Sequence, residues 1–243
     1  MKDFSQRVNC PPVVAAPDVD WSKAGRIPID RNDEPLVQVC PSRSSISVIS
    51  SYANQGIPGA ISSCYVRQGV YDRLISVART LPSAYRLVVL DAWRPFSVQQ
   101  HLFDTLFESI RASHPEFNDT ELRNRTLEFV CLPRREEDSP SSHLTGGAVD
   151  VTLSDADGHL LDMYTQFDEA VPESYTVFLE RYEKLKPKQR RARDNRRLLY
   201  WAMLEQGFTN LTSEWWHYDF GDQLWAYYSG KERAFYGVAK PVN

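Results

Sequence analysis

The stretch Ser141-Ser142-His143-Leu144-Thr145-Gly146-Gly147-Ala148-Val149-Asp150 passes from a loop rich in serine and glycine into a strand predicted over 148–153. Gly146 and Gly147 permit the chain to fold back, so the imidazole of His143 can reach the carboxylate of Asp150. His217 offers a second imidazole from a different strand. Two imidazoles and one carboxylate leave a fourth position for water, as in catalytic rather than structural zinc sites. The stretch therefore predicts a metal site that ties two distant parts of the chain together.

Ligand type alone does not identify the metal. Neutral imidazole and carboxylate suit zinc, but cobalt, nickel and iron accept the same ligands. A single histidine is more often a surface or core residue than a ligand, and His101, His114 and His159 lack matching partners, so we assign them no function.

Glu214 lies three residues before His217 in the run Glu-Trp-Trp-His. Residues three apart in an unbroken strand point to opposite faces. If both serve one site, the strand must bend, bulge or begin after Glu214.

Length and composition favour one mixed domain over 1–243. The net charge is −4, which gives no global attraction for nucleic acid. No run of about 18 apolar residues predicts a membrane span, and no signal peptide is visible, so we expect a cytoplasmic protein. The four scattered cysteines, without a Cys-x-x-Cys pair, favour reduced thiols.

The remaining pattern predicts helices and strands in alternation. Residues 1–35 contain five prolines and predict an extended arm, which Trp21 would anchor. Strands are predicted over 36–39, 46–49, 85–93, 208–211 and 215–220, and helices over 70–80, 97–111, 119–130 and 195–206.

Two segments have competing interpretations. Asp155-Ala156-Asp157-Gly158 resembles half of a calcium loop but lacks the later carboxylates, so it predicts a hairpin turn into 159–163. The basic tract 184–197 could bind phosphate or anionic lipid, but without interleaved aromatic residues we favour a solvated linker and first helical turns.

Taken together, the motifs resemble those of VanX-like zinc D-alanyl-D-alanine dipeptidases, within the wider group of D-alanyl-D-alanine dipeptidases and carboxypeptidases. The resemblance extends from about residue 46 to 220. It rests on Trp93-Arg94-Pro95, Ser141-x-His143-x-x-Gly146-x-Ala148-x-Asp150, Phe167-Asp168 and Glu214-Trp215-Trp216-His217, in the family's order. The chain departs from the family where Tyr52-Ala53-Asn54-Gln55 lacks the usual aromatic residue after the asparagine.

The resemblance implies an α+β fold, with helices packed on a central antiparallel sheet and a zinc cleft. It implies zinc on His143, Asp150 and His217, Glu214 as general base, and Arg94 as the partner of the oxyanion. Asp168, helped by Ser141, would bind the free amine of a dipeptide.

Three functions remain open at this point. The first is hydrolysis of free D-Ala-D-Ala or a related dipeptide with a D-residue. The second is a peptidoglycan D,D-carboxypeptidase or L,D-endopeptidase, although a stem peptide would place no ammonium at Asp168. The third is a zinc-binding domain without activity, which the presence of both Glu214 and Arg94 disfavours.

Overall fold

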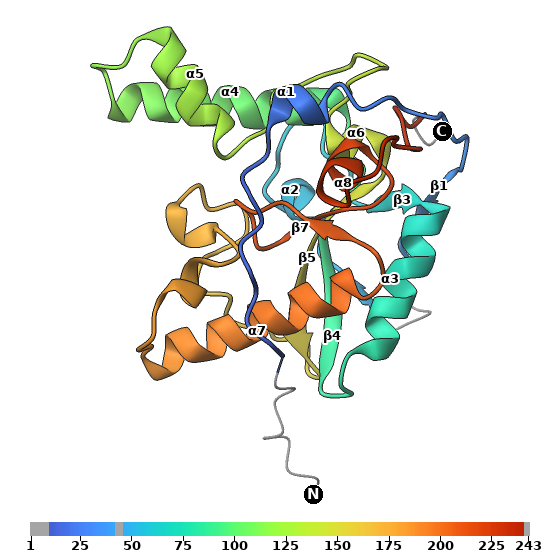
Figure 1. The fold of residues 1–243 in the computed structure, drawn as a ribbon, viewed down its shortest axis with the longest axis vertical. Helices are drawn as coiled ribbons and strands as arrows, with labels where there is room; N and C mark the ends of the chain where they lie inside the picture. The colour runs from blue at the N-terminus through green and yellow to red at the C-terminus, as the bar shows by residue number, and fades with distance from the viewer. Residues whose placement is uncertain (1–9, 42–45, 241–243) are drawn as a thin grey trace, which may run out of the picture.

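A five-stranded sheet runs through the centre of the molecule (Figure 1). The computed structural model describes residues 10–41 and 46–240. In spatial order the strands are β2 (Ile46–Val48), β4 (Tyr85–Asp91), β5 (Ala148–Asp155), β7 (His217–Asp219) and β6 (Thr209–Asn210). Buried residues occupy seven of the eight positions of β5 and the four positions 87–90 of β4, as expected for central strands covered on both faces.

The prediction of an antiparallel sheet is wrong at one edge. Strands β4, β5, β7 and β6 pair antiparallel, but β2 pairs parallel with β4. The chain between β2 and β4 contains helix α3 (Gln68–Thr80), and such a crossover returns the chain in the same direction. The α+β class is confirmed, with a mixed rather than a purely antiparallel sheet.

A small second sheet lies beside the first. It pairs β1 (Leu36–Gln38) antiparallel with β3 (Tyr65–Arg67), directly before α3. The single-turn helix α2 (Ser51–Asn54) follows β2 and contacts β4. These elements bring Tyr52 and Arg67 toward the ends of the central strands.

Helices α3 and α7 (Pro187–Leu204) contact each other and the central sheet. On α3 the buried residues Val70, Leu74, Val77 and Ala78 recur at helical spacing and form one apolar stripe. That stripe joins one continuous core with residues of both sheets, α7 and the two tryptophans before His217.

The remaining helical elements are one pair of longer helices and several short turns. Helices α4 (Phe96–Ser113) and α5 (Asp119–Leu127) pack on each other at one side of the molecule (Figure 1). The short elements are α6 (Ser142–Thr145), η2 (Pro172–Ser174), η3 (Phe178–Arg181) and α8 (Gln223–Tyr228). Asn118 and Glu121 form a capping box at the start of α5.

The N-terminal arm crosses the molecule, and its residues 1–9 lie outside the described structure (Figure 1). Its one helical turn, α1 (Trp21–Ala24), contacts α8. Trp21 contributes to a cavity but stays 37% exposed. The arm is also held by hydrogen bonds that Trp201 Nε1 donates to Pro11 O and Gln223 Nε2 to Ile27 O.

Two sequence predictions need correction. Helix α7 begins at Pro187 rather than near Asn195, because Pro187 occupies the first turn and Gln189 caps the backbone of Lys186. Much of the basic tract is therefore helix. The turn at 155–158 forms, but the predicted partner strand is reduced to one bridge between Ser154 and Leu160.

Candidate metal centre and active site

The three predicted metal ligands come from three neighbouring elements. Asp150 in β5 lies opposite His217 in β7, and directly paired residues of antiparallel strands project from the same face. His143 lies on α6, not in an open loop as predicted. Gly146 ends that turn with a φ of 71°, and a side chain there would clash with Leu36.

The ligand atoms of this group already lie at the spacing of a metal site. His143 Nε2 is 3.2 Å from His217 Nδ1, which is 3.1 Å from Asp150 Oδ1. His143 Nε2 is 3.5 Å from Asp150 Oδ2. Tetrahedral zinc with bonds of roughly 2.0–2.1 Å separates its ligands by about 3.3 Å. The three buried residues therefore match a tetrahedral site closely.

The other nitrogen of each imidazole is held by the protein. His143 Nδ1 lies 2.7 Å from Ala92 O, and His217 Nε2 lies 2.9 Å from Asp219 Oδ1. These acceptors fix which nitrogen carries a proton, and leave His143 Nε2 and His217 Nδ1 free for a metal. Burial alone would lower the pKa of His217, but Asp219 and Asp150 raise it well above its ordinary value.

Glu214 enters the site because β7 begins only at His217, as the Glu-x-x-His spacing requires. A turn precedes the strand, with Glu214 N donating to Leu211 O, and Asn210 Nδ2 donating to Glu214 O. Glu214 Oε2 lies 3.7 Å from His217 Nδ1. Burial raises the pKa of Glu214 to about 8. A cation bound beside it would lower this pKa and make it a base at neutral pH.

Arg94 follows β4 and immediately precedes Pro95, which caps α4. Its Nε lies 3.0 Å from Asp91 Oδ2, and its Nη2 lies 3.5 Å from Asp150 Oδ2. The guanidinium also lies over the ring of Tyr52, 5.1 Å from its centroid. Burial would lower the pKa of Arg94, but Asp91 raises it above the ordinary value. The group is a permanent cation in the cleft.

Asp168 and the metal ligands line one cleft. The cleft has an inner space of about 30 Å³ and an outer space of about 270 Å³. The residues common to both spaces are Leu102, Phe129, Val130, Asp168, Glu214 and Trp216. Asp168 stays exposed to the cleft, while desolvation by its walls raises the pKa of its carboxyl to about 6. The charge of Arg94 and the Tyr52 hydroxyl oppose the rise.

Ser141 also lines the inner space, but its hydroxyl has partners within the protein. It accepts from Arg134 N at 2.9 Å and contacts Leu132 O at 3.2 Å. Its predicted contact with a substrate amine therefore stays a prediction.

Sequence reasoning assigned no function to Asp91, Tyr52 or Asp219, which the structure places against the predicted residues. Asp91 contacts both Arg94 and His143. The signal for Asp91 was its position three residues before Arg94. Asp219 lies two residues after His217, on the same face of the strand. Tyr52 comes from a separate helix, and only the fold brings it here.

A second group of possible ligands, Asp155, Asp157 and His159, differs from the first in position and in burial. It lies on the turn after β5 and is largely exposed. Asp155 Oδ1 accepts from the backbone of Asp157 and His159, so the turn chemistry predicted from sequence accounts for it.

Comparison with known proteins identifies the family of this chain. A family model described as D-ala-D-ala dipeptidase matches residues 65–238. The chain belongs to this family. The matched range contains Arg94, Asp168 and the His143, Asp150, His217 group, and members of this peptidase family are metal-dependent hydrolases.

Two relatives carry the same description. A D-alanyl-D-alanine dipeptidase of Synechocystis sp. is 31% identical over 217 residues, which cover 83% of this chain and 87% of that protein. A D-alanyl-D-alanine dipeptidase of Escherichia coli is 38% identical over 145 residues, 60% of this chain and 59% of that protein. In the described part of this family member, no helix is long and apolar enough to cross a membrane.

Proposed function

We propose that this protein is a zinc-dependent dipeptidase that hydrolyses free D-Ala-D-Ala to two molecules of D-alanine. The observation that carries the proposal is the convergence of a buried His-Asp-His group, a glutamate, an arginine and an aspartate on one cleft. Family membership and the two dipeptidase relatives support the substrate class.

Zinc fits the donor set at His143, Asp150 and His217. Each imidazole offers its free nitrogen, and Asp150 is a ready ligand because His143 and His217 hold its pKa below the ordinary value despite burial. When bound, zinc would polarise the scissile carbonyl and lower the pKa of a water to about 7.

Glu214 acts as general base and then as general acid. Its carboxylate takes the proton from the attacking water and later delivers it to the nitrogen of the leaving D-alanine. One group suffices for both steps, because the proton that it receives is the one that the leaving amine needs. No covalent enzyme intermediate is required.

Arg94 stabilises the negative charge that develops on the scissile carbonyl oxygen. Its guanidinium is fixed in advance by Asp91 and by the ring of Tyr52, so little reorganisation accompanies the reaction. The side chain is 9% exposed, which keeps its field strong in the cleft.

Asp168 binds the substrate's free ammonium. Without substrate, desolvation raises the pKa of its carboxyl, and an arriving ammonium would lower it again and restore the charge. A substrate with an acylated amine leaves this carboxylate without a cation, which explains a requirement for a free N-terminus. Ser141 remains a predicted second contact of the amine.

The direct test is D-alanine release from D-Ala-D-Ala by the zinc-loaded protein. We expect turnover with about one zinc per chain, loss of turnover on chelation, and recovery when zinc is returned. Glu214→Gln is the matched control, because it keeps the three ligands and removes only the base. Zinc-loaded protein that binds the metal with full occupancy and releases no D-alanine would contradict the proposal.

A further inference from the structure

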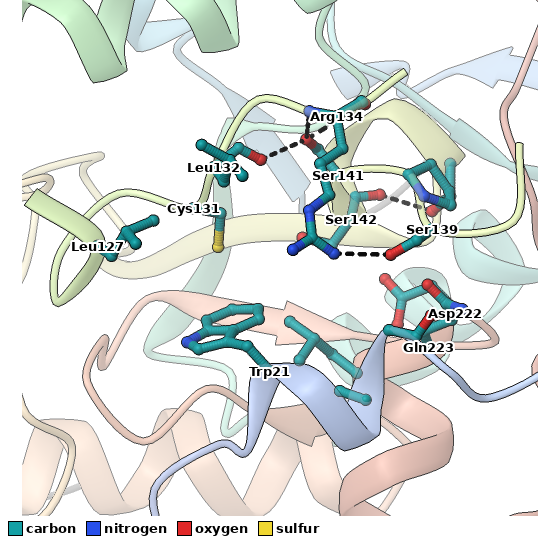
Figure 2. A pocket seen from close by; sticks show the side chains of 15 residues that line it. Trp21, Leu127, Cys131, Leu132, Arg134, Ser139, Ser141, Ser142, Asp222 and Gln223 are labelled. Carbon is teal, nitrogen blue, oxygen red and sulfur yellow. Dashed lines mark hydrogen bonds between the residues drawn. The ribbon is translucent and has the colours of Figure 1, made fainter. Parts of the chain in front are cut away.

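A second cavity lies behind one wall of the active-site cleft. It has a volume of about 120 Å³ and is enclosed by α1, the segment 127–145 and the start of α8 (Figure 2). Cys131, Ser141 and Ser142 line both this cavity and the inner cleft. Ser141, the predicted second contact of the amine, is shared with the cleft, but none of the predicted metal ligands, Glu214, Arg94 or Asp168 lines this cavity, so the proposed hydrolysis does not account for it.

The lining of the cavity is largely apolar. Its lining includes the large apolar side chains of Trp21, Leu127, Leu132 and Leu224. An apolar cavity of roughly 150 Å³ stays dry and accepts a molecule the size of benzene. This cavity is slightly smaller and suits a body of about five carbon atoms.

One cation enters this apolar space. Figure 2 shows the guanidinium of Arg134 pointing between Ser139 and Trp21, and its Nη1 donates to Ser139 Oγ at 2.8 Å. A side chain at Gly25 would lie 3.1 Å from that nitrogen, so a residue without Cβ makes room for the cation. In the described part of the chain, no carboxylate lies within 4.0 Å of Arg134.

The nearest buried acid in the lining does not neutralise this charge. Asp222 accepts from Trp225 N through Oδ1 and caps α8. Burial and the neighbouring Asp219 raise the pKa of Asp222 well above its ordinary value, which favours the neutral form of its carboxyl. The cavity therefore combines an apolar body with one positive charge, and its complement is an apolar anion.

We propose that this cavity binds a small monocarboxylate with a branched aliphatic body, its carboxylate on Arg134 and its body against Trp21, Leu127 and Leu132. A guanidinium suits a carboxylate because it offers two parallel donors. The site is separate from the dipeptide cleft and does not depend on the proposed hydrolysis.

The test uses the zinc-loaded full chain, labelled with ¹⁵N and titrated with isovalerate. The Trp21 indole N–H signal is assigned through a Trp21→Phe variant. We expect a saturable shift of this signal, and binding at least about tenfold weaker for isovaleramide, which has the same shape without the charge.

Two variants separate this site from other causes. Arg134→Gln should weaken isovalerate binding at least about tenfold, whereas Arg135→Gln should leave it unchanged. Arg135 is the next residue, but its guanidinium lies over the ring of Phe96, 3.9 Å from the centroid, and it does not line the cavity. Ala24→Leu should fill the cavity and abolish binding while Arg134 stays in place.

Carboxylates also bind zinc, so the titration is repeated on the chelated protein. The proposal requires the same Trp21 shift without metal. Any one of four results would overturn it. The Trp21 signal does not move at tens of millimolar isovalerate, the amide binds as tightly as the acid, Arg134→Gln binds undiminished, or the shift is lost on chelation.

Discussion

Replacement of Arg94 should lower both kcat and the unfolding free energy, and the two losses can be measured separately. Arg94→Ala removes the donor that faces the developing oxyanion, which typically costs roughly 3 to 4 kcal/mol, or about 10² to 10³ in kcat. It also leaves Asp91, whose side chain is 13% exposed, without its cation. Breaking a buried ion pair costs about 3 to 5 kcal/mol.

We expect a smaller stability loss in this case. The pKa of Asp91 is already raised to about 6 by burial, so its carboxyl can take up a proton at neutral pH when the cation is gone. Neutralisation costs about 1.4 kcal/mol for each unit between pKa and pH, so a carboxyl with a pKa of about 6 needs about 1.4 kcal/mol at pH 7, and the expected loss of unfolding free energy lies below the usual range for a broken pair.

The double variant Asp91→Asn with Arg94→Ala provides the control. It removes the unpaired carboxylate, so it should recover most of the stability in urea unfolding while kcat on D-Ala-D-Ala stays low. An Arg94→Ala enzyme within tenfold of wild-type kcat would refute the assignment, as would a double variant that regains activity with stability. The second result would mean that Arg94 acts only by neutralising Asp91.

Three further predictions concern the metal centre. Glu214→Gln should bind zinc normally and lose about 10² to 10⁴ in kcat, whereas His217→Ala should lose zinc as well, and metal analysis beside kinetics distinguishes them. Asp219→Ala should weaken zinc affinity about 10- to 100-fold in a chelator competition, because His217 loses the acceptor that orients it; unchanged affinity would count against that function. Burial raises the pKa values of Asp91 and Glu214 to about 6 and 8, so the folded metal-free protein binds these protons more tightly than the unfolded chain. The unfolding free energy of the metal-free protein should therefore fall as the pH rises from about 4 to 8, and zinc should oppose this loss. A melting temperature in chelator that rises over this pH range would contradict the prediction.

Local sequence signals predicted most of the secondary structure. Local patterns located α3, α4 and α5, and the alternation after Gly147 located β5. The start of α7 was missed because a run of like charges is typical of a solvated segment. The proline at its first turn and the packing of Ala192, Arg196 and Leu199 overrule that preference.

Strand direction and partner choice depend on contacts that no local pattern contains. The parallel pairing of β2 with β4 follows from the path of the chain through α3, not from the residues 46–48 themselves. The same holds for Tyr52, which reaches the cleft because α2 packs beside β4.

The candidate site was more predictable than the fold around it. Metal binding needs particular residue types, so His143, Asp150 and His217 could be selected before their distances were known. The spacing of Glu214 and His217 predicted that the strand bends, bulges or begins after Glu214, and β7 begins at His217. Supporting residues such as Asp219 were missed, because an aspartate beside a histidine has no distinctive pattern until its acceptor distance is seen.

The decisive assay compares free D-Ala-D-Ala with its N-acetylated copy on the zinc-loaded protein, with D-alanine release as the readout. We expect cleavage of the free dipeptide only, and a loss of this discrimination in Asp168→Asn. Cleavage of the acetylated dipeptide as well as or better than the free one would contradict it and indicate a carboxypeptidase.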